Sequence, residues 1–168
     1  AVSIWDEGTA WFAQRPFQQS TEPSGVCRLT WEPGNPETAV ISPVSGAQGM
    51  PSRFVWDIEA IASDTVYAAT EAGLAMVVLP PGVSRIYTIA DGLPSNYVAS
   101  VAVTGSGDIF AGTATGLAII SNGSVRVVPE VTGFVECLCA DHLGGVWAGV
   151  PGTLYRVGHD GVVQTFTR

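Results

Sequence analysis

The protein has 168 residues, of which 46% are hydrophobic and only 13% are charged, and it contains 20 glycines and 11 prolines. This composition argues against a charge-rich helical bundle and favours short strands joined by many turns. Fifteen acidic residues against seven basic ones give a formal net charge of −8, which leaves little basic charge to neutralise phosphates and excludes a nucleic-acid partner.

The beginning of the chain predicts a strand, a turn and an aromatic strand within residues 2–13. A polar insertion that contains proline follows between Gln14 and Gly25. Loops of this composition interrupt regular structure. We therefore expect the first structural unit, residues 1–48, to be the most irregular one.

A recurrence with a step of 43 residues organises the middle of the chain. The segment 49–55 (Gly-Met-Pro-Ser-Arg-Phe-Val) returns as 92–98 (Gly-Leu-Pro-Ser-Asn-Tyr-Val), and 66–74 returns as 109–117. A more divergent copy covers residues 135–149. Repeats of about 40 residues with several short strands each are typical of propeller blades.

Each copy divides into four short apolar stretches separated by turn residues. In the best-defined copy we expect strands over 97–104, 109–112, 117–121 and 125–128. The Asn122-Gly123 pair between the last two is a strong hairpin signal, because both positions accept positive φ. The prediction is an all-β protein, a β-propeller of four-stranded antiparallel blades, and the alternative, a two-sheet sandwich, does not explain the recurrence.

The repeat boundaries define the domain organisation. We predict a single β-propeller domain or segment over residues 1–168, with blades at about 1–48, 49–91, 92–131 and 132–168. Aromatic residues followed by alanine recur in the second strand of every blade, and we expect them in the blade cores: Phe12, Tyr67, Phe110 and Trp147.

The segments 92–98, 106–113 (Ser-Gly-Asp-Ile-Phe-Ala-Gly-Thr) and 116–117 (Gly-Leu) resemble the two-component regulator propeller repeat, with the best match over residues 49–128. The last blade departs from the pattern, since Val150 replaces the threonine. In that family propellers often form the extracytoplasmic sensing part of signalling proteins, so the resemblance implies a sensing role and a periplasmic or extracellular location. Four blades either close alone as a small propeller or form part of a larger ring. Repeats of the family usually build larger rings, which favours further blades.

These features predict a non-enzymatic interaction or sensing module that presents loops to a partner protein or a small polar ligand. An open arc of about four blades exposes two apolar blade faces, so we expect additional blades, a protein partner or a second copy of the chain to cover them. Two alternatives stay open: a propeller-fold lyase or hydrolase with a ligand-face active site, and a structural subunit or fragment of a larger assembly. No apolar run is long enough to cross a membrane, so we expect no membrane insertion by this segment.

Candidate binding residues come from loops that share one face of a propeller, namely the loops between blades and those joining second to third strands. They are Arg15, Gln18, Glu22, Arg53, Glu71, Asn96, Tyr97 and Glu130. Asp57 and Glu59 alternate on a first strand, nearest the axis, so both carboxylates lie on one face. The pair either lines a channel, where it could hold a cation, or accepts hydrogen bonds from the neighbouring blade.

Other chemistry-bearing residues do not converge in the sequence. His142 and His159 fall in turns on the opposite face, where general acid–base catalysis has no partner groups. The spacing of Cys137 and Cys139 is too short for the usual zinc pair. We therefore predict no catalytic residues, no metal site and no cofactor.

Overall fold

The computed structural model describes residues 1–14 and 25–167, and within them the chain forms sixteen strands and two 3-10 helices. Blade 1 contains β1 (Val2–Asp6), β2 (Thr9–Gln14), β3 (Gly25–Glu32) and β4 (Asn35–Val44). Blade 2 contains β5 (Val55–Ala60), β6 (Thr65–Thr70), β7 (Gly73–Val78) and β8 (Gly82–Tyr87). Blade 3 contains β9 (Val98–Val103), β10 (Ile109–Thr113), β11 (Gly116–Ser121) and β12 (Ser124–Thr132). Blade 4 contains β13 (Cys137–Ala140), β14 (Val146–Val150), β15 (Thr153–Val157) and β16 (Val163–Thr167).

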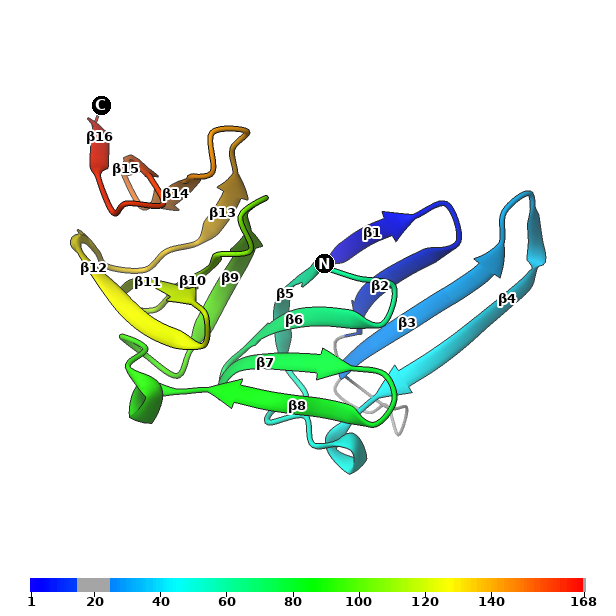
Figure 1. The fold of residues 1–168 in the computed structure, drawn as a ribbon. Coiled ribbons are helices and arrows are strands. Elements are labelled where there is room, and N and C mark those ends of the chain that lie inside the picture. The colour runs from blue at the N-terminus through cyan, green and yellow to red at the C-terminus, as the bar shows by residue number, and fades with distance from the viewer. Residues whose placement is uncertain (15–24, 168) are drawn as a thin grey trace.

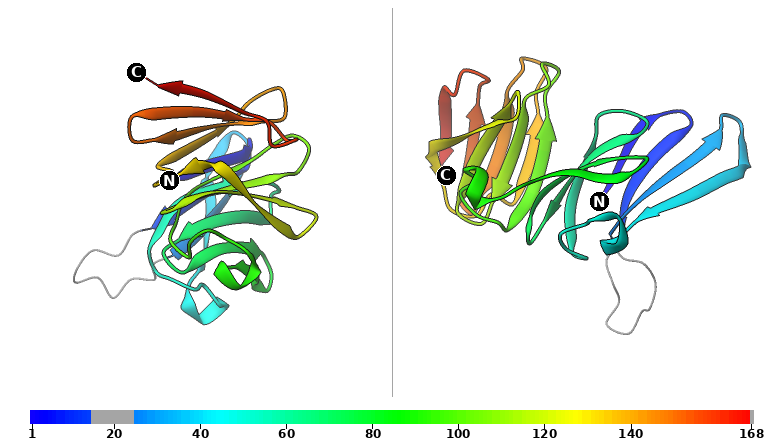
Figure 2. Two further views of the ribbon diagram at one scale, coloured as in Figure 1. Left: turned by 90° about the vertical axis from the view of Figure 1, so that its left-hand side faces the viewer. Right: turned by 60° about the horizontal axis from the view of Figure 1, so that its bottom comes forward.

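Every blade is a four-stranded antiparallel meander whose strands pair in chain order. The first strands of neighbouring blades contact one another, which places β1, β5, β9 and β13 on the inside. The blades stand side by side along an open arc, with blade 1 and blade 4 at its two ends (Figure 1, Figure 2). The prediction of an all-β propeller architecture with about four blades is confirmed.

Three apolar clusters lie between the blades, because alternate residues of a strand face opposite sides of its sheet. On β6, Val66 and Ala68 join the cluster shared with blade 1, whereas Tyr67 and Ala69 join the cluster shared with blade 3. A third cluster around Phe110 joins blades 3 and 4. The second strands of the two middle blades are accordingly buried along their whole length, and apart from threonines at their ends their residues are apolar or glycine.

The aromatic position of the second strand is Trp11 in blade 1, and the prediction that named Phe12 is wrong by one residue. Trp11 is fully buried between blades 1 and 2 and pairs with Ser3, just as Tyr67 pairs with Glu59. Phe12 faces the outer side of blade 1 and is only half-buried. A shift of one residue moves a side chain to the opposite face of a strand, so this difference decides which side of the sheet is filled.

The threonine that ends the second strand and the Gly-Leu that begins the third form one hydrogen-bonded turn in each middle blade. The buried hydroxyl of Thr70 donates to the carbonyl of Gly73 at 2.7 Å, and Thr113 does the same to Gly116 at 2.7 Å. Gly73 has a φ of 124°, and a Cβ there would lie 2.6 Å from the Tyr87 carbonyl oxygen. The turn between second and third strands therefore requires both residue types.

The links between blades repeat as well. The 3-10 helices η1 (Gly46–Gln48) and η2 (Ile89–Asp91) begin after Ser45 and Thr88. The side chains of Gln48 and Asp91 reach back to accept hydrogen bonds from these cap residues' backbone N–H groups, at 2.9 Å in both cases. Neither 3-10 helix has the length of a membrane span, and the part of the chain that the structure describes holds no other helix.

Candidate functional site

Two of the residues predicted on the loop face, Glu71 and Asn96, hold the loops themselves. Glu71, in the β6–β7 turn, accepts a hydrogen bond from the Ser52 hydroxyl at 3.0 Å. Asn96 accepts one from the backbone N–H of Ile89 at 2.8 Å and so fixes the link between blades 2 and 3. Arg53 is exposed in the link that precedes β5. Arg15, Gln18 and Glu22 lie outside the described residues, and Glu130 is an exposed residue of β12.

An aromatic row crosses this same face at the start of the first strands. The ring of Tyr97 lies 5.4 Å from that of Trp56 in blade 2 and 6.0 Å from that of Phe134 in blade 4's link, measured between centroids. Tyr97 and Phe134 each precede the valine that begins the matching repeat segment. The repeat could therefore have predicted Phe134, whereas sequence reasoning selected only Tyr97.

The two carboxylates of β5 have different roles. One oxygen of Asp57 accepts a hydrogen bond from the backbone N–H of Ile58 at 2.9 Å, and the other accepts from Val101 of β9 at 3.0 Å. The Asp57 carboxylate thus joins the inner strands of blades 2 and 3. Both of its oxygens therefore take part in holding the fold.

Glu59 is half-buried at the end of β5, and within residues 1–14 and 25–167 it makes no hydrogen bond and no ion pair. Burial raises the pKa of its carboxyl group above the ordinary value, and the neighbouring charge of Asp57 raises it further. Its counterparts in the other blades are the uncharged residues Ser3, Ala102 and Cys139, as the strand registers show. The acid is therefore not required by the repeat.

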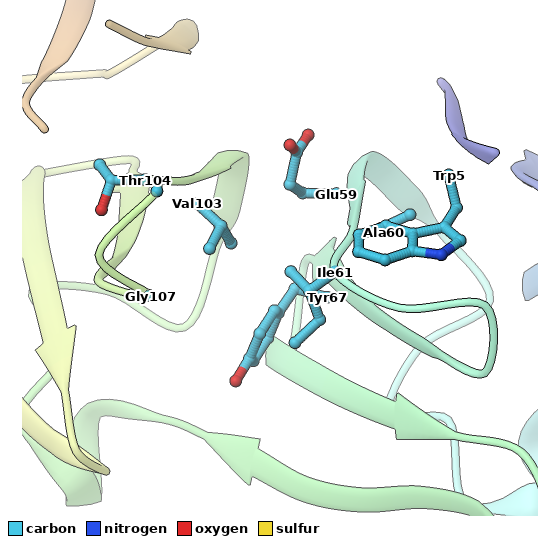
Figure 3. Close-up of a pocket in the computed structure, with 9 residues that line it drawn as sticks. Trp5, Glu59, Ala60, Ile61, Tyr67, Val103, Thr104 and Gly107 are labelled. Carbon is cyan, nitrogen blue, oxygen red and sulfur yellow. The ribbon is translucent and has the colours of Figure 1, made fainter. Parts of the chain in front are cut away.

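Glu59 borders a cavity of about 470 Å³ between blades 1, 2 and 3 (Figure 3). Trp5 of β1, Ile61 after β5 and Tyr67 of β6 line one side, and the β9–β10 turn lines the other. The complete lining is Trp5, Glu59, Ala60, Ile61, Tyr67, Val103, Thr104, Gly105 and Gly107. The cavity lies where first strands turn into second strands, on the face opposite to the predicted binding loops.

The outer face of blade 4 exposes residues that are buried elsewhere. Leu154 and Phe166 are cross-strand neighbours and are 42% and 49% exposed. The corresponding pair in blade 3, Leu117 and Val128, is 0% and 1% exposed in the cluster between blades 3 and 4. Trp147, the counterpart of the buried Phe110, packs on Phe166 with the ring centroids 5.5 Å apart. This surface has the make-up of an interface between blades.

The outer face of blade 1 shows the complementary pattern. Val2 is 70% exposed, whereas its counterpart Ile58 on β5 is 3% exposed and packs toward blade 1. Ile4, on the same side of β1, is equally open to solvent. At each end of the arc, the outer blade therefore exposes apolar residues whose counterparts in the neighbouring blade are buried between two blades.

Residues with catalytic or metal-binding chemistry stay apart. His142 lies in the β13–β14 turn and His159 in the β15–β16 turn, and neither borders the cavity at Glu59. No group of three or more His, Cys, Asp or Glu side chains within the described residues could hold a metal ion. Cys137 and Cys139 are exposed on the outer face of blade 4.

No family model matches the chain, and no curated protein matches it. Among solved structures it is similar to the extracellular domain of a hybrid two-component system from B. thetaiotaomicron, with a TM-score of 0.74, 14% identity, and coverage of 100% of this chain and 21% of that one. It is also similar to virginiamycin B lyase from Staphylococcus aureus, with a TM-score of 0.70, 13% identity and coverage of 99% and 54%. The WD40 β-propeller domain of Doa1 gives a TM-score of 0.63, 17% identity and coverage of 100% and 50%.

At these identities the comparisons establish the propeller fold and nothing more. The chain spans between about a fifth and about half of the length of these three structures.

Proposed function

We propose that this chain is a four-blade segment of a β-propeller interaction or sensing module, which binds a partner or ligand and whose two end blades pack against further blades. The exposed pair Leu154 and Phe166 carries the proposal, because the same positions of blade 3 are buried against the next blade. Burying a side chain of this size contributes about 1.5–3 kcal/mol. The occupant that fits is another four-stranded blade, since such a blade covers this face elsewhere in the chain.

The sensing part of the proposal has separate support. The repeat resembles one that often forms sensing parts of signalling proteins, and two of the similar solved structures are extracellular domains of two-component systems from B. thetaiotaomicron. An extracytoplasmic location goes with that role. A lyase activity like that of the Staphylococcus aureus neighbour has weaker support, because His142 and His159 lie in separate turns that do not border the cavity at Glu59.

The association state of the purified chain tests the proposal. In the isolated chain a blade that covers the outer face of blade 4 must come from a second copy, so we expect concentration-dependent association in sedimentation velocity experiments. The double variant Leu154→Ser/Phe166→Ser should shift the chain to monomer. Leu143→Ser, which removes a still more exposed leucine from the β13–β14 turn, serves as the control and should associate like the wild type. A wild-type chain that stays a folded monomer at all concentrations would overturn the proposal.

A further inference from the structure

We propose that the cavity at Glu59 binds a small organic cation, with the Glu59 carboxylate as the counter-ion and the Trp5 indole as an aromatic wall. This inference deepens the proposed function by naming a class of ligand, and it rests on that function only in treating the chain as a binding module. It does not depend on whether further blades cover the ends of the arc.

The charge of the cavity is the first argument. Glu59 is the one carboxyl group that borders the cavity among the described residues, and no arginine lines it. The two ion pairs within residues 1–14 and 25–167, Arg85 with Asp91 and Arg156 with Asp141, lie elsewhere. A half-buried carboxylate without a cation inside the protein favours a cation from outside, because pairing offsets the cost of removing the charge from water.

The contrast with Asp57 sharpens this argument. Asp57 lies two residues away on the same face of β5, and both of its oxygens accept backbone hydrogen bonds. The fold therefore uses one acid of the pair as a link between blades and leaves the other open to the cavity, where Figure 3 shows its carboxylate standing clear of the surrounding side chains.

The aromatic wall is the second argument. Trp5 is 46% exposed and its indole lies beside Ala60 and Ile61 at the cavity (Figure 3). The face of an indole ring attracts a cation through its quadrupole, and tryptophan does so better than tyrosine or phenylalanine. An exposed tryptophan and a carboxylate that line one cavity supply the two interactions that an alkylammonium group favours.

The dimensions and the overall charge agree with a small ligand. A cavity of about 470 Å³ is within the size range of small-molecule sites. Gly105 and Gly107 form part of the wall without side chains, and a Cβ at either position would meet no atom within 4 Å. The net charge of −8 draws cations toward the protein and repels anions.

Choline is the first probe, and its neutral isostere 3,3-dimethyl-1-butanol is the matched control compound. Binding is measured by isothermal titration calorimetry on the purified chain, and the Trp5 indole N–H is followed by NMR, with its signal assigned from the Trp5→Leu variant. We expect choline to shift the Trp5 signal and to bind at least about tenfold more tightly than the isostere. Glu59→Gln should weaken choline binding by about tenfold or more, and Glu37→Gln, an exposed acid on β4, should leave it unchanged.

Two binding results would overturn this inference: equal affinity for choline and its isostere, or unchanged choline binding in Glu59→Gln. It would also be overturned if neither choline nor a second cation, phenethylamine, shifts the Trp5 NMR signal. Circular dichroism of Glu59→Gln checks that a loss of binding is not a loss of fold. The two proposals fail in different ways. A chain that associates but does not bind cations refutes only the cation site. A chain that stays monomeric but binds choline refutes only the proposed packing of the end blades.

Discussion

The carboxylate of Asp57 on β5 accepts a hydrogen bond from the backbone N–H of Val101 on β9 at 3.0 Å, and this contact joins the innermost strands of blades 2 and 3. Ser3 of β1 makes a related contact, accepting from the backbone N–H of Ala60 at 3.0 Å. Blades in this arc are therefore joined by side chain to backbone bonds near the axis in addition to the apolar clusters between them.

Replacement of Asp57 tests the contribution of this link. Asp57→Ala leaves the partly buried N–H of Val101 without its acceptor, and we expect a loss of about 1–3 kcal/mol in the free energy of unfolding. Asp57→Asn keeps an acceptor oxygen and should lose less. Urea unfolding at neutral pH measures both variants, and an Asp57→Ala protein as stable as the wild type would show that the link carries no energy.

The difference in the free energy of unfolding between Glu59→Gln and the wild type should depend on pH. Burial and the Asp57 charge raise the pKa of Glu59 in the folded protein, so the ionised form is disfavoured there relative to the unfolded chain. Charged or titratable neighbours that face it are Asp57 on β5 and Tyr67 on β6. Above the folded pKa the substitution removes this penalty, and we expect Glu59→Gln to be more stable than wild type at pH 7.

This advantage should shrink as the pH falls through the folded pKa and vanish below the ordinary value of 4.5, where Glu59 is protonated in both states. Urea unfolding curves at several pH values measure the difference. The exposed-site variant Glu37→Gln should show no such trend. A Glu59→Gln advantage that grows toward acidic pH would contradict the environment described for this residue.

The buried threonine of the turn between second and third strands should contribute measurably to stability. In Thr113→Val the carbonyl of Gly116 and the N–H of Thr115 lose their partner, and we expect a cost of about 1–3 kcal/mol. Thr132→Val makes the same chemical change at an exposed position of β12 and should be close to neutral. Thermal unfolding of the two variants compares them directly, and equal melting temperatures would refute this role.

Gly73 should tolerate no side chain. Gly73→Ala combines a φ of 124° with a Cβ placed 2.6 Å from the Tyr87 carbonyl oxygen, so we expect a destabilisation of about 1–3 kcal/mol or more. Gly105→Ala, where a Cβ meets no atom within 4 Å, is the matched control and should be nearly neutral. Chemical unfolding of both proteins gives the comparison, and similar midpoints would show that the backbone adapts at Gly73.

The fold was largely predictable from the repeat. Asn122-Gly123 forms the expected hairpin, with positive φ at both residues, and the strands of blade 3 lie within a few residues of their predicted bounds. The 43-residue step aligns side chains that have the same packing role, such as Tyr67 and Phe110, so one good copy describes the next. The repeat misplaces the aromatic position of blade 1 by one residue, because the adjacent Trp11 and Phe12 both fit the pattern and only the strand register distinguishes them.

The candidate site is harder to predict, because it depends on residues that differ from one blade to the next. Glu59 was selected as one of a pair, but the sequence could not show that Val101 would satisfy Asp57 and leave Glu59 open. The sequence does not indicate a role for Trp5, because this residue lines a cavity only once β1 lies beside β5. The polar groups of Glu71 and Asn96 also bind within the protein, to the Ser52 hydroxyl and to the Ile89 backbone N–H, which their place in exposed loops does not predict.

The most direct test of the open blade face is the reactivity of its cysteines. Cys137 and Cys139 are exposed on the outer face of blade 4, whereas Cys27 is buried, and burial raises the pKa of its thiol. Labelling with a maleimide, followed by mass spectrometry of the peptides, reports whether another blade covers that face. We predict that Cys137 and Cys139 react rapidly in dilute wild-type protein, become protected as the concentration rises, and stay reactive in Leu154→Ser/Phe166→Ser. Equally fast labelling of the wild type at every concentration would contradict the account.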